Sequence, residues 1–336
     1  MPIRGGTLSQ TTSAPASFAP ALPRLTTTVP REYVHRAAVA EVLLTGWRKV
    51  EANRFRVWAQ WPRGHSFFSP LRGVQHDPML VAETVRQIGS LLAHAEFDVP
   101  LGFQFLMWHL DYSLRPRHTA LESTPAELVL DVECSEIRRK GRSFGGMRYD
   151  VVIRRDGAVA ATGSASYTCT SPEVYRRLRG DRIPGTPPAL GAPVRPRRVG
   201  RRSPFDVVLA EEDAPGAARW RLRADGRHPV LFDHPVDHVP GMVLLEAARQ
   251  AAAVLSPDPV ILPTELTSSF HRYAELDSPI WIEAARETAA GGRNGPATTV
   301  VRGHQDDELL FTCALTSIRP RNAPAPPGDT AVNPSE

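Results

Sequence analysis

The stretch LFDHPVDHVPGMVLLEAARQAAA, residues 231–253, joins a polar loop to an apolar helix. The loop carries two Asp and two His residues and ends at a Pro-Gly pair, and the apolar run after it predicts a helix over residues 240–255. Three polar residues interrupt this helix at spacings of three and four, which places them on one face: Glu246, Arg249 and Gln250. A mostly apolar helix with one polar stripe is the first indication that this segment carries a site.

A weaker copy of the pattern, HDPMLVAETVRQ, occupies residues 76–87. When Met79 is aligned with Met242, the polar residues of the two copies coincide: Glu83 with Glu246, Arg86 with Arg249, and Gln87 with Gln250. In this copy Asp77 is typical of a helix cap and Pro78 of a first helical residue, and the helix is predicted to reach about residue 95. An internal repeat of this kind predicts a duplicated structural unit.

The composition is that of a globular protein. The 336 residues, of which 42% are hydrophobic, are enough for two domains with real cores. There is no run of about 18 apolar residues, so we expect no transmembrane helix, and we expect no signal peptide at the start of the chain. The three cysteines are scattered without metal-ligand spacing, as in a reduced, cytoplasmic protein.

The net charge of +4 comes almost entirely from arginine, because the chain has only two lysines, Lys49 and Lys140. We interpret this bias as a mark of a GC-rich genome rather than of nucleic-acid binding, since the arginines are spread along the chain, apart from residues 195–202. A mildly basic surface also suits an acidic protein partner or a phosphorylated substrate.

Composition along the chain predicts two domains between two tails. Residues 1–30 are rich in Thr, Ser, Ala and Pro and are expected to form a disordered leader. We place a first domain at 31–180, a linker rich in proline and arginine at 181–204, a second domain at 205–320, and a disordered tail at 321–336.

Both predicted domains show the same order of elements, a strand, one helix and then consecutive strands. In the first, a strand at 50–61 precedes the helix, and four strands follow at 102–114, 126–138, 144–154 and 158–171. Asp156-Gly157 is a good hairpin turn between the last two, and Asp306-Asp307 takes its place in the second domain. There, short strands at 205–209 and 218–224 precede the helix, and strands follow at 262–273, 279–288, 297–303 and 309–317. One helix followed by a meander favours an α+β fold with an antiparallel sheet around that helix.

The polar stripe of the second helix has two interpretations. Glu246 and Arg249 either form an ordinary ion pair within the helix, or they line a pocket together with Gln250. Two copies at the same spacing favour a pocket for at least one of them, but the repeat does not say which copy is active.

The loop before the second helix offers further candidate groups. Backbone N–H groups at the Pro240-Gly241 turn begin a helix and are suited to bind an oxygen as it gains negative charge. Four side chains are candidate bases near that turn: Asp233, His234, Asp237 and His238. Alternatively, Asp237 caps the helix and His238 is a loop histidine with its hydrogen bonds satisfied. Zinc binding is disfavoured, because neither an HExxH motif nor a set of cysteines is present.

The spacing from His234 to Gln250, HPxDHVPGMxxxEAxRQ, resembles the signature of the A-factor biosynthesis (AfsA-type) proteins, the γ-butyrolactone synthases of high-GC bacteria. The first copy, HDPxxxxExxRQ over residues 76–87, is similar to the N-terminal motif of that family, and the resemblance covers about residues 31–320. It implies two tandem hotdog domains that form a pseudo-dimer within one chain. In hotdog dimers the substrate lies at the interface, within reach of both helices.

More distantly, the second motif resembles the hotdog-fold 3-hydroxyacyl carrier-protein dehydratases. In that family a His before the loop and a Glu of the helix form the dehydration pair, roles that would fall on His234 and Glu246. The loop here is two residues shorter between His and Pro-Gly, which argues against plain dehydration. The first copy lacks Pro-Gly, and its nearest preceding histidines are His65 and His76.

The activity implied by the AfsA-type resemblance is acyl transfer. A β-ketoacyl group moves from the thioester of an acyl carrier protein to a hydroxyl of dihydroxyacetone phosphate, on the way to a γ-butyrolactone, furan or butenolide signal that controls secondary metabolism. When these roles are transferred to this sequence, the resemblance implies that Gly241 polarises the thioester carbonyl and that Glu246, with His234, removes the proton of the alcohol. Glu83 is the equivalent base if the first site is the active one. Arg249 or Arg86 holds the phosphate, and further substrate contacts are predicted at Gln250, Gln87, Asp237, His238, His76 and Asp77.

No cofactor, metal, nucleic acid or membrane is implied by the resemblance, and the chain is expected as a monomeric pseudo-dimer or as a homodimer. Two alternatives stay open. One is a hotdog dehydratase or thioesterase, and the other is a regulator that binds an acyl chain or a lactone without catalysis. The arginines of both motifs discriminate, because a phosphorylated acceptor requires them and a dehydratase does not.

Overall fold

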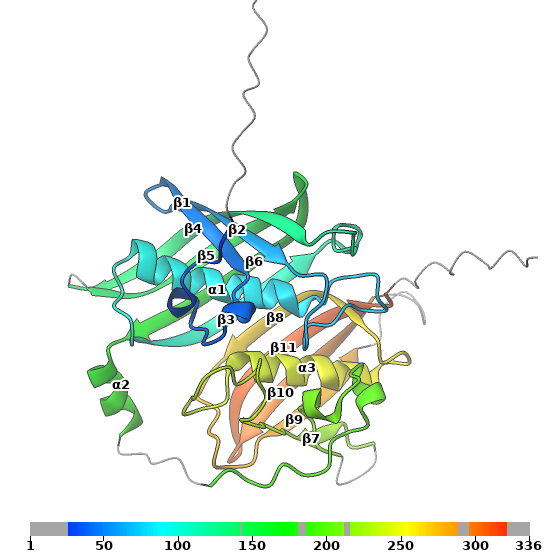
Figure 1. Cartoon of the computed structure of the whole chain (residues 1–336). Helices are drawn as coiled ribbons and strands as arrows, with labels where there is room; N and C mark the ends of the chain where they lie inside the picture. Colours follow the sequence, from blue (N-terminus) through cyan, green and yellow to red (C-terminus); the bar gives the residue numbers. More distant parts are fainter. Residues whose placement is uncertain (1–25, 142, 181–185, 212–215, 288–295, 321–336) are drawn as a thin grey trace, which may run out of the picture.

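The computed structural model describes residues 26–141, 143–180, 186–211, 216–287 and 296–320 (Figure 1). The tail predicted at 321–336, most of the leader predicted at 1–30, and the start of the predicted linker lie outside these residues. The described chain forms one antiparallel sheet of 11 strands with two long helices against it, α1 and α3. None of the helices in this part of the chain is long and apolar enough to cross a membrane.

The two halves of the chain repeat the same order of elements. The first half contains β1 Leu44–Glu51, β2 Arg54–Trp61, α1 Met79–Glu96, β3 Gln104–Leu114, β4 Ala126–Lys140, β5 Ser143–Arg155, β6 Ala158–Thr170 and α2 Pro172–Arg179. The second half contains β7 Arg219–Arg221, α3 Gly241–Leu255, β8 Leu262–Phe270, β9 Trp281–Glu287, β10 Ala297–Gln305 and β11 Glu308–Ile318. Short 3₁₀ turns lie at η1 Arg31–Val34, η2 Val39–Glu41, η3 Pro116–His118, η4 Pro196–Val199 and η5 Pro204–Asp206.

The strand order shows how the halves join. It runs β1-β2-β4-β5-β6-β3 in the first half and continues as β8-β11-β10-β9-β7 in the second. The strand that follows α1 therefore pairs edge to edge with the strand that follows α3. At this joint Ser268 donates its backbone N–H to Asp111 and its hydroxyl to the carbonyl of Leu110. The joint gives one continuous sheet and places α1 and α3 side by side (Figure 1).

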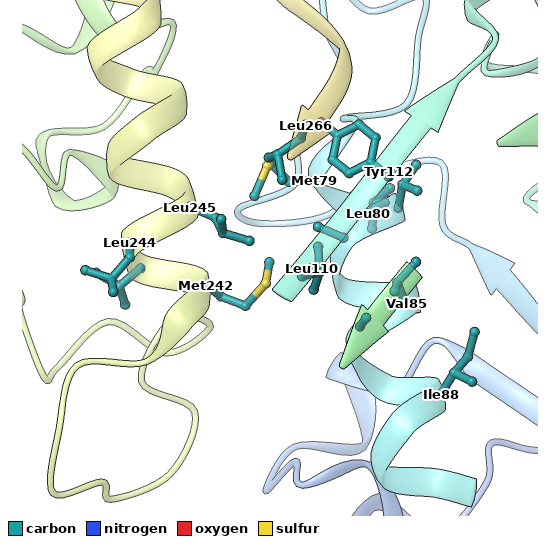
Figure 2. Packing of buried hydrophobic residues seen from close by; sticks show 14 of the residues in the cluster. Met79, Leu80, Val85, Ile88, Leu110, Tyr112, Met242, Leu244, Leu245 and Leu266 are labelled. Atoms are coloured by element: carbon teal, nitrogen blue, oxygen red, sulfur yellow. The ribbon is translucent and has the colours of Figure 1, made fainter. Parts of the chain in front are cut away.

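Apolar packing between the two helices and the joint fixes their separation. Figure 2 shows Met242 and Leu245 of α3 pointing toward Met79 of α1 and Leu110 of β3. The side chains of this cluster are almost fully buried. Gly89 lets the sheet approach α1 closely, because a Cβ there would lie 2.8 Å from the hydroxyl of Tyr149. The fold is thus the predicted α+β arrangement, a sheet around one central helix in each half.

Several local predictions are confirmed. Asp156 and Gly157 have positive φ values of 50° and 78° and turn β5 into β6. Asp306 and Asp307 do the same between β10 and β11, with φ values of 50° and 63°. Positive φ at both central residues is the geometry that a tight two-residue hairpin requires.

Other local predictions are wrong. Residues 205–209 do not form a strand, because Ser203 accepts a hydrogen bond from the N–H of Phe205 and Pro204 starts the 3₁₀ turn η5. The single strand predicted at 50–61 is the second half of a hairpin, with β1 before it. Helix α2 was not predicted at all. These errors concern short segments whose structure depends on capping and on tertiary contacts rather than on periodicity.

Candidate active site

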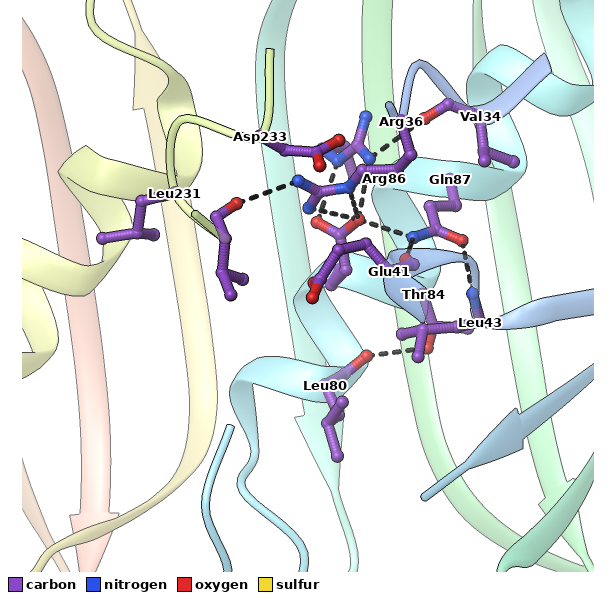
Figure 3. A network of polar contacts seen from close by, with 12 residues as sticks. Val34, Arg36, Glu41, Leu43, Leu80, Thr84, Arg86, Gln87, Leu231 and Asp233 are labelled. Carbon is purple, nitrogen blue, oxygen red and sulfur yellow. Dashed lines mark hydrogen bonds and ion pairs between the residues drawn. The ribbon is translucent and has the colours of Figure 1, made fainter. Parts of the chain in front are cut away.

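The polar stripe of α1 is a buried ionic network around Glu83. Figure 3 shows Arg36, Arg86 and Gln87, which belong to this network. The carboxylate accepts from Arg86 at 2.7 and 2.9 Å, from the amide of Gln87 at 2.6 Å, and from Arg36 at 3.1 Å. Arg36 also donates to the carbonyl of Val230 at 3.0 Å. The network therefore ties α1 to the segment that leads into the loop before α3.

The stripe of α3 is the same network built a second time. Glu246 accepts from Arg249 at 2.6 and 2.8 Å, from Gln250 at 2.6 Å, and from Arg201 at 3.0 Å. Arg201 donates to the carbonyl of Phe67, as Arg36 does to that of Val230. The two halves are thus related by an approximate twofold symmetry that includes side chains and not only the backbone.

Arg36 and Arg201 are the functional residues that the motif reasoning missed. They precede their glutamates by 47 and 45 residues, outside the helices. A signal for them exists in the sequence, because Val-x-Arg-x₄ followed by an acidic residue and Val occurs at Val34 and again at Val199. Residues 196–201 of the predicted linker therefore carry part of the second network.

Both glutamates are held in the ionised form. Burial alone would raise the pKa of Glu83, but the charges of Arg36 and Arg86 and the hydrogen bonds to it lower that pKa to about 2. The pKa of Glu246 is lowered to about 2 for the same reasons, with Arg201 and Arg249 as the cations. A carboxylate with such a low pKa and filled acceptor positions is a poor proton acceptor, which favours a role in holding the arginines.

A cavity of about 830 Å³ lies beside the network around Glu83, and its lining does not include Glu246, Arg249 or Arg201 of the other network. It lies between α1, the start of β3 and the loop that leads into α3. Five of the sequence-predicted site residues line it: Arg86, His234, Asp237, His238 and Gly241. The other seven are buried away from its wall: Glu83, Gln87, His76, Asp77, Glu246, Arg249 and Gln250.

One end of the cavity is charged and the remainder is mostly apolar. Arg36, Arg86, Asp233 and His234 line the charged end, and Figure 3 shows Asp233 beside the guanidinium groups. Apolar and aromatic side chains line the rest, among them Phe105, Leu106, Met107, Leu110, Leu244 and Phe270. Such a cavity suits a ligand with a long apolar chain and an anionic head.

His234 lies at the charged end, half exposed, with Asp233 behind it. Nδ1 of His234 lies 3.8 Å from a carboxylate oxygen of Asp233, which also accepts the backbone N–H groups of Ala37 and Ala38. Partial burial lowers the pKa of His234, with Asp233 opposing the shift and Arg36 and Arg86 adding to it. The imidazole is therefore neutral near neutral pH and is able to accept a proton.

Asp237 and His238 form a second pair on the cavity wall. Asp237 accepts hydrogen bonds from the Tyr175 hydroxyl at 2.6 Å, from His238 at 2.7 Å and from Arg179 at 3.3 Å. These contacts, led by that of His238, lower the pKa of Asp237. Asp237 does not cap α3, because the N-cap position is Pro240 and no side chain caps this helix. Within the described residues, no group of three or more His, Cys, Asp and Glu side chains is arranged to hold a metal ion.

The N-termini of the two helices differ. At α3, which meets the cavity at Gly241, the backbone N–H groups of Gly241 and Met242 find no acceptor among the described residues. At α1, Pro78 has no N–H, and the carboxylate of Asp77 accepts the N–H of Met79 at 2.9 Å. The asymmetry leaves one helix N-terminus open to a ligand and closes the other.

Fold and site together define a tandem hotdog protein with a mostly apolar cavity beside the ionic network of its first half. The chain belongs to the A-factor biosynthesis hotdog domain family, whose model matches residues 19–171 and 186–319. This confirms the resemblance seen in the two motifs.

Three relatives in streptomycetes are each named 2-oxo-3-(phosphooxy)propyl 3-oxoalkanoate synthase. The one from Streptomyces virginiae is 55% identical over 292 residues, which cover 87% of this chain and 98% of that protein. The one from Streptomyces coelicolor is 42% identical, covering 90% of this chain and 95% of its own length. The one from Streptomyces griseus is 40% identical, with 86% and 95% covered.

Proposed function

We propose that the chain is an acyltransferase that makes a 2-oxo-3-(phosphooxy)propyl 3-oxoalkanoate. The β-ketoacyl donor is the thioester of an acyl carrier protein, and the acceptor is a hydroxyl of dihydroxyacetone phosphate. The ester is a precursor of a γ-butyrolactone, furan or butenolide signal. The name of the relative with 55% identity supports this reaction. The proposal places the protein in the cytoplasm, where both substrates are available, as a monomeric pseudo-dimer or a homodimer.

The observation that carries the proposal is the composition of the cavity. Its apolar part accommodates an acyl chain, while Arg36 and Arg86 present two guanidinium groups at the other end. Forked guanidinium groups suit a phosphate. Glu83 neutralises part of their charge and fixes their direction, so we assign it a positioning role rather than that of a base.

The reaction needs one proton shuttle and one oxyanion site. Neutral His234 takes the proton of the acceptor hydroxyl as its oxygen attacks the thioester carbonyl carbon. The N–H groups at Gly241 and Met242 stabilise the carbonyl oxygen while it carries the negative charge. When the intermediate collapses, the C–S bond breaks and His234 returns its proton to the departing thiolate.

The remaining predicted residues take supporting roles in this proposal. Gln87 holds the carboxylate of Glu83 and also accepts the N–H of Leu43. Asp237 and His238 shape the part of the cavity wall next to Tyr175 of α2. Glu246, Arg249 and Gln250 form the matching network that stabilises the second half, with His76 and Asp77 buried near it.

An assay of the purified chain tests the proposal. The protein is incubated with 3-oxoacyl carrier proteins of several chain lengths and with dihydroxyacetone phosphate, and products are identified by mass spectrometry. A phosphorylated ester that forms only when both substrates are present is the expected result. Free 3-oxo acid or an enoyl product without ester, at every chain length, would instead point to the thioesterase or dehydratase alternative.

A further inference from the structure

Helix α2 is fixed by its inner face to the wall of the cavity. Tyr175 lines the cavity and donates its hydroxyl to Asp237 at 2.6 Å. Arg179 pairs with Glu275 at 2.6 and 2.8 Å, and its guanidinium lies 4.6 Å from the ring centre of Tyr273. The outer face of α2 is therefore held at a defined place next to the cavity.

That outer face is basic and apolar. Arg176 and Arg177 are exposed and form no ion pair with any other residue that the structure describes. Leu178, between them and Arg179, is 70% exposed, the highest value among the exposed large hydrophobic residues of the described chain. Glu173 is the only acidic residue of the helix and lies in its first turn. The pKa of Glu173 is lowered by its hydrogen bond with Ser171 and also by the charges of Arg176 and Arg177, so the two arginines are partly balanced within the helix. This face still carries more positive than negative charge, beside an exposed leucine, and arginine is enriched at protein interfaces.

A second exposed leucine lies at the same end of the sheet. Leu101 is 56% exposed and directly precedes Gly102 and Phe103, which line the cavity. Gln104, at the start of β3, pairs with Thr170, at the end of β6, and α2 follows β6 directly. We use the name α2 patch for the exposed residues Leu101, Arg176, Arg177 and Leu178, which lie on either side of these paired strand ends.

We propose that the α2 patch is the docking surface for the acyl carrier protein, an inference that rests on the proposed function for the identity of the donor. Carrier proteins present acidic side chains around the serine that bears their phosphopantetheine arm, which complements Arg176 and Arg177. From the α2 patch, the arm enters the cavity past Tyr175 and brings the thioester toward Gly241.

The leucines decide between a carrier protein and a nucleotide as the occupant. A coenzyme A thioester would use cations for its phosphates but would leave both Leu101 and Leu178 exposed. A protein partner buries them and so removes their apolar surface from water, which is favourable. The combination of exposed cations with exposed leucines therefore matches a protein surface.

Binding of apo carrier protein, which lacks the arm, tests the α2 patch alone. In R176E/R177E we expect the dissociation constant to rise about tenfold or more, since like charges then face each other. The matched control is R115E/R117E, which reverses two exposed arginines beyond the other end of β3. That strand has 11 residues and spans about 33 Å. The control should bind as the unmodified protein does.

A second measurement separates docking from catalysis. Transfer from a small 3-oxoacyl pantetheine thioester should keep its rate in R176E/R177E, while transfer from the carrier protein loses about tenfold or more in kcat/KM. Unchanged binding of apo carrier protein in R176E/R177E, or equal loss in the control, overturns the inference. Loss with the small thioester as well also overturns it, because α2 would then support the cavity instead. Because the binding measurement needs no turnover, its result stands even if the proposed reaction is not found.

Discussion

Arg86 and Arg249 occupy equivalent positions in the two networks, but only Arg86 lines the cavity. If Arg86 binds the acceptor phosphate, Arg86→Lys keeps the charge but loses the fork of donors. We expect the KM for dihydroxyacetone phosphate to rise about tenfold or more, with the KM for the thioester unchanged. Steady-state kinetics with each substrate varied in turn measures both values.

Arg249→Lys is the matched control for this prediction, since it removes the same contacts from the buried copy of the network. It should lower stability but leave the KM for the acceptor as it was. A rise in that KM for Arg249→Lys, with no rise for Arg86→Lys, would show that the phosphate binds at the other network.

His234 is expected to set the pH dependence of the rate. Burial lowers its pKa below the ordinary value of 6.5, so the neutral, proton-accepting form persists below that pH. The rate should be flat around neutrality and should fall only as the pH drops through the lowered pKa. His234→Ala should reduce kcat by about a hundredfold and remove this acidic limb.

His238→Ala is the comparison for His234, because His238 lines the same cavity but is hydrogen-bonded to Asp237 at 2.7 Å. The acidic limb should remain in this variant. A pH profile that loses its acidic limb in His238→Ala and keeps it in His234→Ala would show that His238, and not His234, is the base.

The N-termini of α1 and α3 give a prediction at the scale of secondary structure. Asp77 accepts the N–H of Met79, the first residue of α1, and is almost fully buried, so Asp77→Ala should cost about 1–2 kcal/mol in the free energy of unfolding. The kinetic constants at a temperature where the variant is folded should not change, because Asp77 does not line the cavity. Denaturant unfolding and the acyltransfer assay check the two parts, and a marked loss of activity would support the sequence-based prediction that Asp77 binds substrate.

The two long helices could be predicted because their apolar runs and repeated polar residues are local patterns. Arg36 and Arg201 could not be found that way, since each meets its glutamate across more than 40 residues of chain. Periodicity does not predict helix α2, because five of its eight residues are charged or proline. The two helix N-termini differ because α1 is preceded by Asp77-Pro78 and α3 begins at Pro240-Gly241. The sequence does not show that only the second of these N-termini meets the cavity.

At the scale of the whole molecule, duplication has left two matching networks, and the cavity of about 830 Å³ adjoins the one around Glu83. Glu83→Gln and Glu246→Gln remove equivalent charges from equivalent surroundings, each leaving two buried arginines without their carboxylate. Both variants should therefore lose similar stability, about 3 kcal/mol or more. Their activities should differ, because only the arginines held by Glu83 line the cavity.

Well below the unfolding temperature of either variant, Glu83→Gln should lose about tenfold or more in kcat/KM while Glu246→Gln stays within about twofold of the unmodified chain. Thermal unfolding of both variants compares their stabilities. Steady-state kinetics of both variants at one common temperature compares their kcat/KM values. If the two variants lose activity in equal proportion, the two halves contribute equally to catalysis and the assignment of a single site is wrong. If activity differs as expected while stability does not, one half supplies the acceptor-binding arginines and the other supplies the open helix N-terminus, so that the fused pair is the smallest unit able to catalyse the transfer.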